Sequence, residues 1–378
     1  MEYKRPLKFE LICEDLRSKI LLGQFDVEGK LPAEDVLALT FNCSRPTIRK
    51  ALEKLQIEGV IYKIQGSGSY IKNNNITSQT SGTPQVINSD SFFGLIFPNL
   101  GAGYVFDSIS NYVATYLAAK GYSLIWGGYL SPHSTNFMQE LTLICNRYIQ
   151  LGVKGVFFSP FEYTPQRGQA NHFVLTTFAQ AGIPVVLLDS DVDDFPKRNP
   201  FDLVSLDHIA DCFILCDHML SQGITRLIFF APPSSMETIR LRLVGYHEAL
   251  IVHGITPKED WFVVCDPKDH NAVKTAFDKH QPEGIVCSND GTAVQLMRTL
   301  SELGIKVPDQ VLMAGFDNLS YLSDMKVSLT SLMQPVQAMG RIAVQTLLQR
   351  IEEPDTPFKT IRLSGKLIIR KTSTKPSF

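Results

Sequence analysis

The sequence lacks the short motifs on which several large enzyme classes depend. It contains no GxxxxGK phosphate loop followed by Ser or Thr, no GxSxG nucleophile turn and no HExxH zinc motif. The nearest segment, His247-Glu248-Ala249-Leu250-Ile251, has no second histidine. No run approaches the roughly 20 apolar residues of a membrane-spanning helix, and the charged start is not followed by an apolar signal segment. We therefore expect a cytoplasmic protein with no enzymatic activity and no membrane partner.

Cysteine frameworks and strong net charge are missing as well. The seven cysteines are odd in number and scattered along the chain, unlike a disulfide framework or a paired CxxC zinc site. We expect them to be reduced and structural, and we expect no metal and no cofactor. The net charge of −2 argues against a generally basic nucleic-acid coat, but residues 1–75 alone carry +2 and the rest −4. Only the first segment is slightly positive.

One polar stretch divides the chain. Residues 73–90 read NNNITSQTSGTPQVINSD, with a single charge and almost no large apolar residue. This composition is typical of a linker. We therefore predict a first domain at 1–72, a flexible linker at 73–90 and a second domain at 91–378.

Short apolar runs alternate with amphipathic stretches throughout residues 91–378. The runs include FFGLIF (92–97), SLIW (123–126), GVFF (155–158), PVVLLD (184–189), LVSL (203–206), RLIFF (226–230), WFVV (261–264), GIVC (284–287) and VLMAGF (311–316). This alternation predicts an α/β fold with helices on both faces of a parallel sheet. About ten strands fit two doubly wound halves better than one wide sheet. Such halves leave a cleft at the carboxyl ends of their strands, where ligands bind.

The first domain has the pattern of a winged helix-turn-helix. Apolar residues at 9–22 repeat at three and four spacing, Pro32 begins a second helix that ends near Phe41, and Ser44 is placed to cap a third from Arg45 to about Glu58. The alternating run 60–64, a glycine-containing turn and residues 69–71 predict a hairpin.

The third helix has two distinct faces. Its apolar side consists of Ile48, Ala51, Leu52 and Leu55, which we expect to be buried. Its other side presents basic and hydroxyl residues at an exposed helix start, namely Arg45, Thr47, Arg49 and Lys50. Such a helix start suits the DNA major groove, where Arg pairs with guanine. On spacing alone, a protein-binding winged helix with a solvated basic face is the alternative.

Residues 7–72 resemble the GntR family of winged helix-turn-helix regulators. The matching segments are Leu31–Glu34, Ser44–Leu52, Leu55, Glu58-Gly59 and Gln65–Ile71. The resemblance implies DNA contacts by Ser44, Arg45, Thr47, Arg49, Gln65 and Gly66. One position departs from the family: many members have an arginine after the glutamate of the LPxE motif that also touches DNA, and here Asp35 stands there.

Residues 92–371 resemble the effector domain of lactose-repressor-type regulators, which is similar to periplasmic sugar-binding proteins. The resemblance rests on Asp189 after a buried strand, the run 206–230, Arg240–Tyr246, Cys287–Asp290, the run 303–318 and Leu329–Pro335. Together with the GntR-type start, the chain looks most like the arabinose-repressor subgroup. This implies a small N-terminal winged helix-turn-helix domain and a two-lobed periplasmic-binding-protein-like domain of doubly wound parallel sheets.

Polar residues after apolar runs are the candidate ligand contacts. A selective sugar site needs side chains with two polar atoms, together with an apolar face for the ring. The resemblance implies that Asp189, Arg242, Asn289 and Asp317 line the cleft. Other candidates remain open between two roles: Asp290 is a ligand contact or a helix cap, and Gln334 is a ligand contact or part of a hinge. Arg240 could form a surface salt bridge, which leaves Arg242 as the better ligand candidate. Four aromatic residues are candidates for stacking on the ligand or for the core, namely Tyr104, Phe106, Phe161 and Trp261.

These observations predict a ligand-responsive transcriptional regulator. We expect a homodimer that binds double-stranded operator DNA and represses genes of pentose or deoxyhexose use, released by a sugar such as L-arabinose. A nucleobase or phosphorylated effector, or action as an activator, is the alternative, because the fold alone does not choose between them.

Overall fold

The computed structural model describes most of the chain. The described residues are Phe9, Ile12, Cys13, Leu16 and the ranges 31–41, 43–57, 61–64, 68–71, 91–98, 100, 105–128, 130, 134, 136–162, 164, 166–233, 237–319, 322, 325 and 327–374. The chain divides into two units, Met1–Val86 and Ile87–Phe378. No helix in these described ranges is long and apolar enough to cross a membrane.

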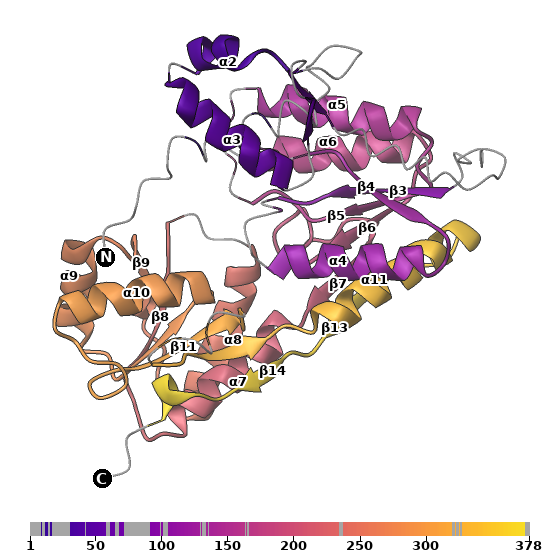
Figure 1. The fold of residues 1–378 in the computed structure, drawn as a ribbon. Helices are drawn as coiled ribbons and strands as arrows, with labels where there is room; N and C mark the ends of the chain where they lie inside the picture. Colours follow the sequence, from indigo (N-terminus) through magenta and orange to yellow (C-terminus); the bar gives the residue numbers. More distant parts are fainter. Residues whose placement is uncertain are drawn as a thin grey trace. The chain divides into compact units, whose positions relative to one another are not determined.

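The first unit contains two described helices and a hairpin (Figure 1). Helix α2 spans Glu34–Thr40 and α3 spans Arg45–Ile57; strands β1 (Ile61–Ile64) and β2 (Gly68–Ile71) are antiparallel. The predicted start of the third helix is confirmed, because the carbonyl of Ser44 accepts hydrogen bonds from the amides of Thr47 and Ile48.

The core of the first unit lies on the predicted face of α3. Ile48, Ala51, Leu52 and Leu55 are buried. They pack with apolar residues from the other segments of the unit, namely Ile12, Cys13, Leu16, Leu31, Leu37 and Ile61. The backbone amide of Leu31 also donates to the carbonyl of Ser69, which ties the segment before α2 to β2. This packing leaves the opposite face of α3 at the surface.

The first lobe of the second unit is built on a six-stranded parallel sheet. Its order is β13-β7-β6-β5-β3-β4. The strands are β3 (Phe92–Ile96), β4 (Ser123–Trp126), β5 (Val156–Phe158), β6 (Val185–Leu188), β7 (Asp202–Leu206) and β13 (Thr360–Leu363). The helices are α4 (Val105–Ala118), α5 (Phe137–Gln150), α6 (Arg167–Gln180) and α11 (Val336–Glu352).

Strand β6 shows why both faces of this sheet are covered. Val186 and Leu188 pack in a cluster with residues of α4 and α11, whereas Val185 and Leu187 pack in another with residues of α5 and α6. Successive side chains of a strand point to opposite faces, so a continuously apolar strand must be buried on both.

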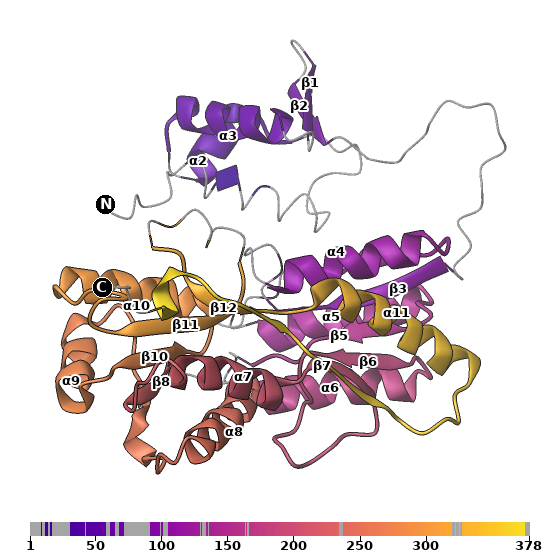
Figure 2. The ribbon, with the colours of Figure 1, turned by 90° about the horizontal axis from the view of Figure 1, so that it is seen from below.

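The second lobe has its own six-stranded sheet, in the order β14-β12-β11-β10-β8-β9. The strands are β8 (Leu227–Ala231), β9 (Phe262–Val264), β10 (Gly284–Cys287), β11 (Leu312–Asp317), β12 (Thr330–Met333) and β14 (Lys366–Ile368); only β14 is antiparallel to its neighbour. Helices α7 (His208–Leu220) and α8 (Glu237–Val252) lie on one face, and α9 (His270–His280) and α10 (Asp290–Glu302) on the other (Figures 1 and 2).

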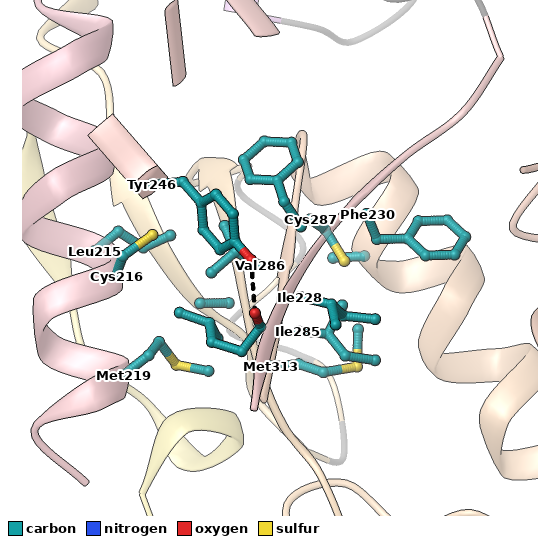
Figure 3. Close-up of a cluster of buried hydrophobic side chains, with 14 of the residues drawn as sticks. Leu215, Cys216, Met219, Ile228, Phe230, Tyr246, Ile285, Val286, Cys287 and Met313 are labelled. Atoms are coloured by element: carbon teal, nitrogen blue, oxygen red, sulfur yellow. Dashed lines mark hydrogen bonds between the residues drawn. The ribbon is translucent and has the colours of Figure 1, made fainter. Parts of the chain in front are cut away.

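Helices α7 and α8 pack unusually closely. A Cβ atom on Gly245 of α8 would lie 2.1 Å from the carbonyl oxygen of Ile209, so the contact requires glycine. The next residue, Tyr246, points into the core and donates a hydrogen bond of 2.7 Å to the carbonyl of Leu227 (Figure 3). Figure 3 also shows Leu215, Cys216 and Met219 of α7 beside this ring. Helix α8 is thereby fixed against the sheet, and with it the position of Arg242.

The chain passes between the two lobes three times. It crosses at Asp207 between β7 and α7, at Gln334-Pro335 between β12 and α11, and at Ser364-Gly365 between β13 and β14. Figure 2 shows this last passage as the yellow segment that joins the two sheets. The predicted α/β fold of two doubly wound halves is confirmed, and residues at these crossings border both lobes.

Candidate functional site

An acidic residue follows β6 at the boundary between the lobes. Asp189 is 7% exposed, and its backbone has a positive φ of 74°. Two hydrogen bonds hold this conformation: the amide of Asp189 donates to Val204, and the hydroxyl of Ser205 donates to the carbonyl of Asp189. A non-glycine residue with positive φ persists only where its surroundings fix it. The carboxylate of Asp189 is therefore held at the carboxyl end of the sheet.

A buried arginine faces this boundary from the second lobe. Arg242 is 5% exposed, and its guanidinium lies 4.2 Å above the ring of Phe316. Its Nε donates to Nδ1 of His208 over 3.3 Å, and its Nη1 donates to the carbonyl of Ser288. No carboxylate of a described residue lies within ion-pair distance of it. A buried guanidinium with N–H groups to spare favours a ligand rich in acceptors.

His208 lies between Asp189 and Arg242. Its Nε2 lies 3.6 Å from Oδ1 of Asp189. Within the described part of the chain, neither of these two buried atoms has a hydrogen-bond partner. Burial lowers the pKa of His208, which favours the neutral imidazole.

Asp317 and Gln334 contribute a second polar pair. Nε2 of Gln334 donates to Oδ1 of Asp317 over 2.8 Å, while its buried Oε1 has no partner among the described residues. Burial raises the pKa of Asp317 to about 6; Arg242 opposes this shift and the charge of Asp189 adds to it. Gln334 therefore lies on a crossing between the lobes and also takes part in the polar cluster.

Glu162 belongs to the same cluster, although the sequence patterns did not single it out. It follows β5 as Asp189 follows β6, and the hydroxyl of Ser190 donates to its Oε1 over 3.4 Å. Burial raises the pKa of Glu162 to about 8, and the neighbouring Asp189 carboxylate adds to the shift. The signal that could have found it is the run GVFFSPFE, in which an acidic residue follows a buried strand.

Two other predicted ligand residues serve the second lobe itself. Oδ1 of Asn289 accepts from the amide of Thr292, so Asn289 caps α10. Asp290 is fully buried, and its carboxylate accepts from the hydroxyl of Ser331 and the amide of Leu319. Through these hydrogen bonds, Asp290 connects the start of α10 to β12 and to the segment after β11.

Among the described aromatic candidates, Trp261 lies away from the cleft. Trp261 precedes β9, at the amino end of that strand, and packs in the core of the second lobe with Lys258 over its ring. The expectation that Trp261 reaches the cleft is wrong, because the cleft lies at the carboxyl ends. Phe161 packs against Phe137 in the first-lobe core, and Phe106 against Phe97. Tyr104 lies outside the described residues.

The exposed face of α3 carries the predicted basic residues. The side chains of Arg45 and Arg49 are 62% and 58% exposed, and Lys50 is exposed as well. The hydroxyls of Ser44 and Thr47 lie 2.7 Å apart at the helix start. Gln65 and Gly66 lie outside the described residues.

The basic face of α3 has acidic neighbours that the sequence did not predict. Arg49 donates to Oε2 of Glu34 over 3.0 Å, and Lys63 donates to Oε1 of the same carboxylate over 3.0 Å. Arg45 forms an ion pair through Nε with Oδ1 of Asp35. Hydrogen bonds from Arg49 and Lys63 hold the pKa of Glu34 below its usual value, so this carboxylate is ionised at neutral pH.

Comparison with protein-family models matches both units. Residues 9–71 match the bacterial regulatory proteins of the gntR family, and residues 216–373 match the periplasmic binding protein-like domain. The chain joins a GntR-type domain to a periplasmic-binding-protein-like domain. The GntR-type match includes α2, α3 and the hairpin. The periplasmic-binding-protein-like match includes Arg242, Asp317 and Gln334.

Known proteins with similar sequences are regulators. The chain is 25% identical to the arabinose metabolism transcriptional repressor of Geobacillus stearothermophilus over 365 residues, 93% of each chain. It is 27% identical to the repressor PurR of Photobacterium profundum over 197 residues, 51% of this chain and 58% of that protein. These relatives and the gntR family are transcriptional regulators, not enzymes.

Solved structures share the fold of the periplasmic-binding-protein-like domain. A LacI family regulator of Enterococcus faecium with bound ribose has a TM-score of 0.60 at 20% identity, covering 76% of this chain and 100% of that one. A complex of the transcriptional regulator CelR with cellobiose has a TM-score of 0.64 at 19% identity, covering 90% and 100%. Both lobes, including Asp189 and Glu162 in the first, therefore belong to one recognised fold.

Proposed function

We propose that this protein is a DNA-binding transcriptional repressor that a sugar releases from its operator. The observation that carries the proposal is the group of buried polar atoms at the lobe boundary, with open hydrogen-bonding capacity on Asp189, His208 and Gln334. Buried polar groups are rarely left unpaired, and a ligand that pairs them would bind selectively. The winged helix-turn-helix supplies the DNA-binding surface.

The chemistry of the cluster favours a neutral polyol. Each sugar hydroxyl both donates and accepts, which matches a site that offers a carboxylate, a neutral imidazole, an amide and a guanidinium. A phosphorylated effector would place its negative charge beside the carboxylates of Asp189 and Asp317, which the buried Arg242 offsets in part. Lys197, Arg198 and Arg362 line the pocket beside Asp189 and His208, so an anionic effector is the alternative that a ligand screen must include. The ring of Phe316, on which a nucleobase could stack, is covered by the guanidinium of Arg242.

The fold offers a route from ligand to DNA. Asp189 belongs to the first lobe and Arg242 to the second, so a sugar that bonds both would hold the lobes together and favour one arrangement of the three crossings. Residues 73–90, which lie outside the described residues, would transmit that change as the linker to a first domain at residues 1–72. In a homodimer, two α3 helices would meet successive major grooves of a palindromic operator.

The similarity to arabinose metabolism repressors supports L-arabinose as the first effector to test. Thermal unfolding would be measured with L-arabinose, D-ribose, L-fucose, D-xylose, hypoxanthine and glucose 6-phosphate at matched concentrations. We expect a free sugar to raise the unfolding temperature, because a ligand that binds only the folded state stabilises it. Stabilisation by hypoxanthine or by the phosphate ester, with no response to any free sugar, would replace the sugar proposal.

DNA binding is tested separately. The full chain would be used to enrich binding sites from a randomised DNA pool, and the enriched site would be measured against random-sequence DNA. We expect a palindromic site with half-sites about one helical turn apart. Failure to enrich any sequence would contradict the role as a specific regulator.

A further inference from the structure

Two adjacent carboxylates face the arginines of the DNA-binding helix. Glu34 and Asp35 form the first turn of α2, and α3 has no acidic residue in its own first turn. Glu34 forms ion pairs with Arg49 and Lys63, and Asp35 forms an ion pair with Arg45. Among the described residues of this surface, three of the four cations Arg45, Arg49, Lys50 and Lys63 therefore have an acidic partner.

Arg45 is the first residue of α3, and its guanidinium forms an ion pair with the carboxylate of Asp35. Both side chains are more than half exposed, so this pair is open to a molecule of DNA that approaches the helix start.

The same carboxylate opposes sequence-independent binding. Contacts to phosphate supply nearly all of the affinity for random DNA, through cations that replace condensed counterions. A carboxylate beside Arg45 competes with phosphate for that cation and repels the DNA backbone. A base edge carries no net charge, so a contact from Arg45 to a base does not suffer this repulsion to the same degree.

A purely local role for Asp35 is the alternative. An acidic residue in the first turn of a helix is stabilised by the helix dipole, typically by ~0.3–1 kcal/mol. Glu34 occupies the same turn and supplies the same interaction. Asp35 is about half exposed and is not among the buried residues of α2. Its ion pair with Arg45 is therefore not required for the stability of α2.

We propose that Asp35 is a specificity-determining residue, which offsets the charge of Arg45 and thereby reduces binding to DNA of random sequence. The inference rests on the proposed function, in which α3 enters the major groove. Asp35 acts through Arg45 and does not itself contact the base.

The test compares Asp35→Asn with the unchanged protein on the enriched site and on random-sequence DNA. The logarithm of the affinity falls with the logarithm of the salt concentration, and each phosphate contact steepens that slope by about 0.9. Each added contact therefore increases the loss of affinity between 50 and 200 mM salt by about threefold to fourfold. We expect the variant to bind random DNA at least threefold more tightly at 50 mM salt, with that steeper slope. The ratio of specific to random affinity should fall by a similar factor.

Two further variants separate charge from fold. Asp35→Glu keeps the charge and should keep the ratio within about twofold. Asp278→Asn removes one partner of an equally exposed ion pair, with Lys274 in the second unit, and should change neither the ratio nor the salt slope. Circular dichroism of each variant checks that the helices are retained.

Each outcome decides the matter. An unchanged ratio and slope in Asp35→Asn would leave Asp35 with a role in α2 alone. Weaker specific binding with unchanged random binding at every salt concentration would mean that Asp35 contacts a base directly. If the unchanged protein enriches no site at all, the proposed function fails and this inference fails with it.

Discussion

Nε2 of His208 lies 3.6 Å from Oδ1 of Asp189, and these two buried atoms, one from each lobe, have no hydrogen-bond partner among the described residues. The separation is slightly too long for a hydrogen bond. A small rotation of either side chain, or a ligand hydroxyl that bonds both, would satisfy the pair. Their neighbours Arg242, Glu162, Asp317 and Gln334 surround this contact, so it is a natural centre for a ligand that joins the lobes.

Replacing Asp189 tests that centre. Asp189→Asn keeps the size of the side chain and removes its charge. We expect the affinity for the effector sugar to fall by about tenfold to a hundredfold, because hydrogen bonds to a charged group contribute ~1.5–3 kcal/mol. Isothermal titration calorimetry measures the change. Asp217→Asn is the matched control, because Asp217 pairs with His253 and does not line the pocket beside Asp189 and His208; equal losses in both variants would contradict the assignment.

An ion pair outside the cleft also joins the lobes. Nη1 of Arg240, on α8, lies 3.1 Å from Oδ2 of Asp194 in the segment between β6 and β7. Both side chains are exposed, so the pair should contribute at most ~1 kcal/mol. We expect Arg240→Ala to weaken sugar binding by about twofold to fivefold at low salt and less at high salt.

A double-mutant cycle with Asp194→Ala measures the coupling of this pair directly. Arg226→Ala is the control, because its partner Glu283 lies in the same lobe. A coupling energy of zero for sugar binding, or an equal effect of Arg226→Ala, would remove the interlobe role of the pair.

The raised pKa of Glu162 predicts how stability changes with pH. With a pKa of about 8 in the folded protein, Glu162 is still protonated at pH 6 to 7, whereas in the unfolded chain it is ionised. The folded state then binds more protons, so the free energy of unfolding falls as the pH rises from about 5 to 8. Asp317, with a pKa of about 6, adds to the same trend at the lower end.

Glu162→Gln should remove a large part of this pH dependence, because the amide does not titrate. Urea unfolding at pH 5, 6.5 and 8 compares the two proteins. We expect the unchanged protein to lose more stability over this range than the variant. Parallel pH profiles would show that Glu162 titrates normally.

A buried ion pair fixes the return of the chain to the first lobe. Arg350, near the end of α11, donates from Nε and Nη2 to the two carboxylate oxygens of Asp202 in β7 over 2.8 and 3.1 Å. Arg350→Met would leave the carboxylate of Asp202 buried without its cation, which typically costs ~3–5 kcal/mol. The urea midpoint should fall accordingly, and adding Asp202→Asn should recover part of the loss. An unchanged midpoint would contradict the assigned role.

Local patterns predicted much of the fold. The apolar runs from 92–97 to 311–316 each contain a strand. An inner strand such as β6 is buried on both faces and is therefore apolar throughout, whereas the edge strands β4 and β9 keep exposed residues. Helix α6 was not predicted, although its buried side chains recur at helical spacing, because the polar Asn171 is one of them: Ala170, Asn171, Val174, Leu175 and Phe178. The return of α11 and β13 to the first lobe was also missed, because it depends on long-range pairs such as Arg350 with Asp202, which sequence spacing does not encode.

The candidate site was predicted in part. Asp189, Arg242, Asp317 and Gln334 gather at the lobe boundary, as their positions after apolar runs and in shared motifs indicated. Trp261 was misplaced because adjacency to a strand does not say which end faces the cleft. Glu162 and the pairing of Asp35 with Arg45 were missed because each depends on a neighbour from another element.

Sugar-dependent release of DNA tests the central claim most directly. Fluorescence anisotropy would follow a labelled enriched site bound to the full chain while the sugar identified by thermal unfolding is added. The account predicts at least a tenfold loss of affinity at saturating sugar for the unchanged protein, with no release from Asp189→Asn at the same concentration. Operator affinity that stays constant in the unchanged protein while the sugar is bound would contradict it.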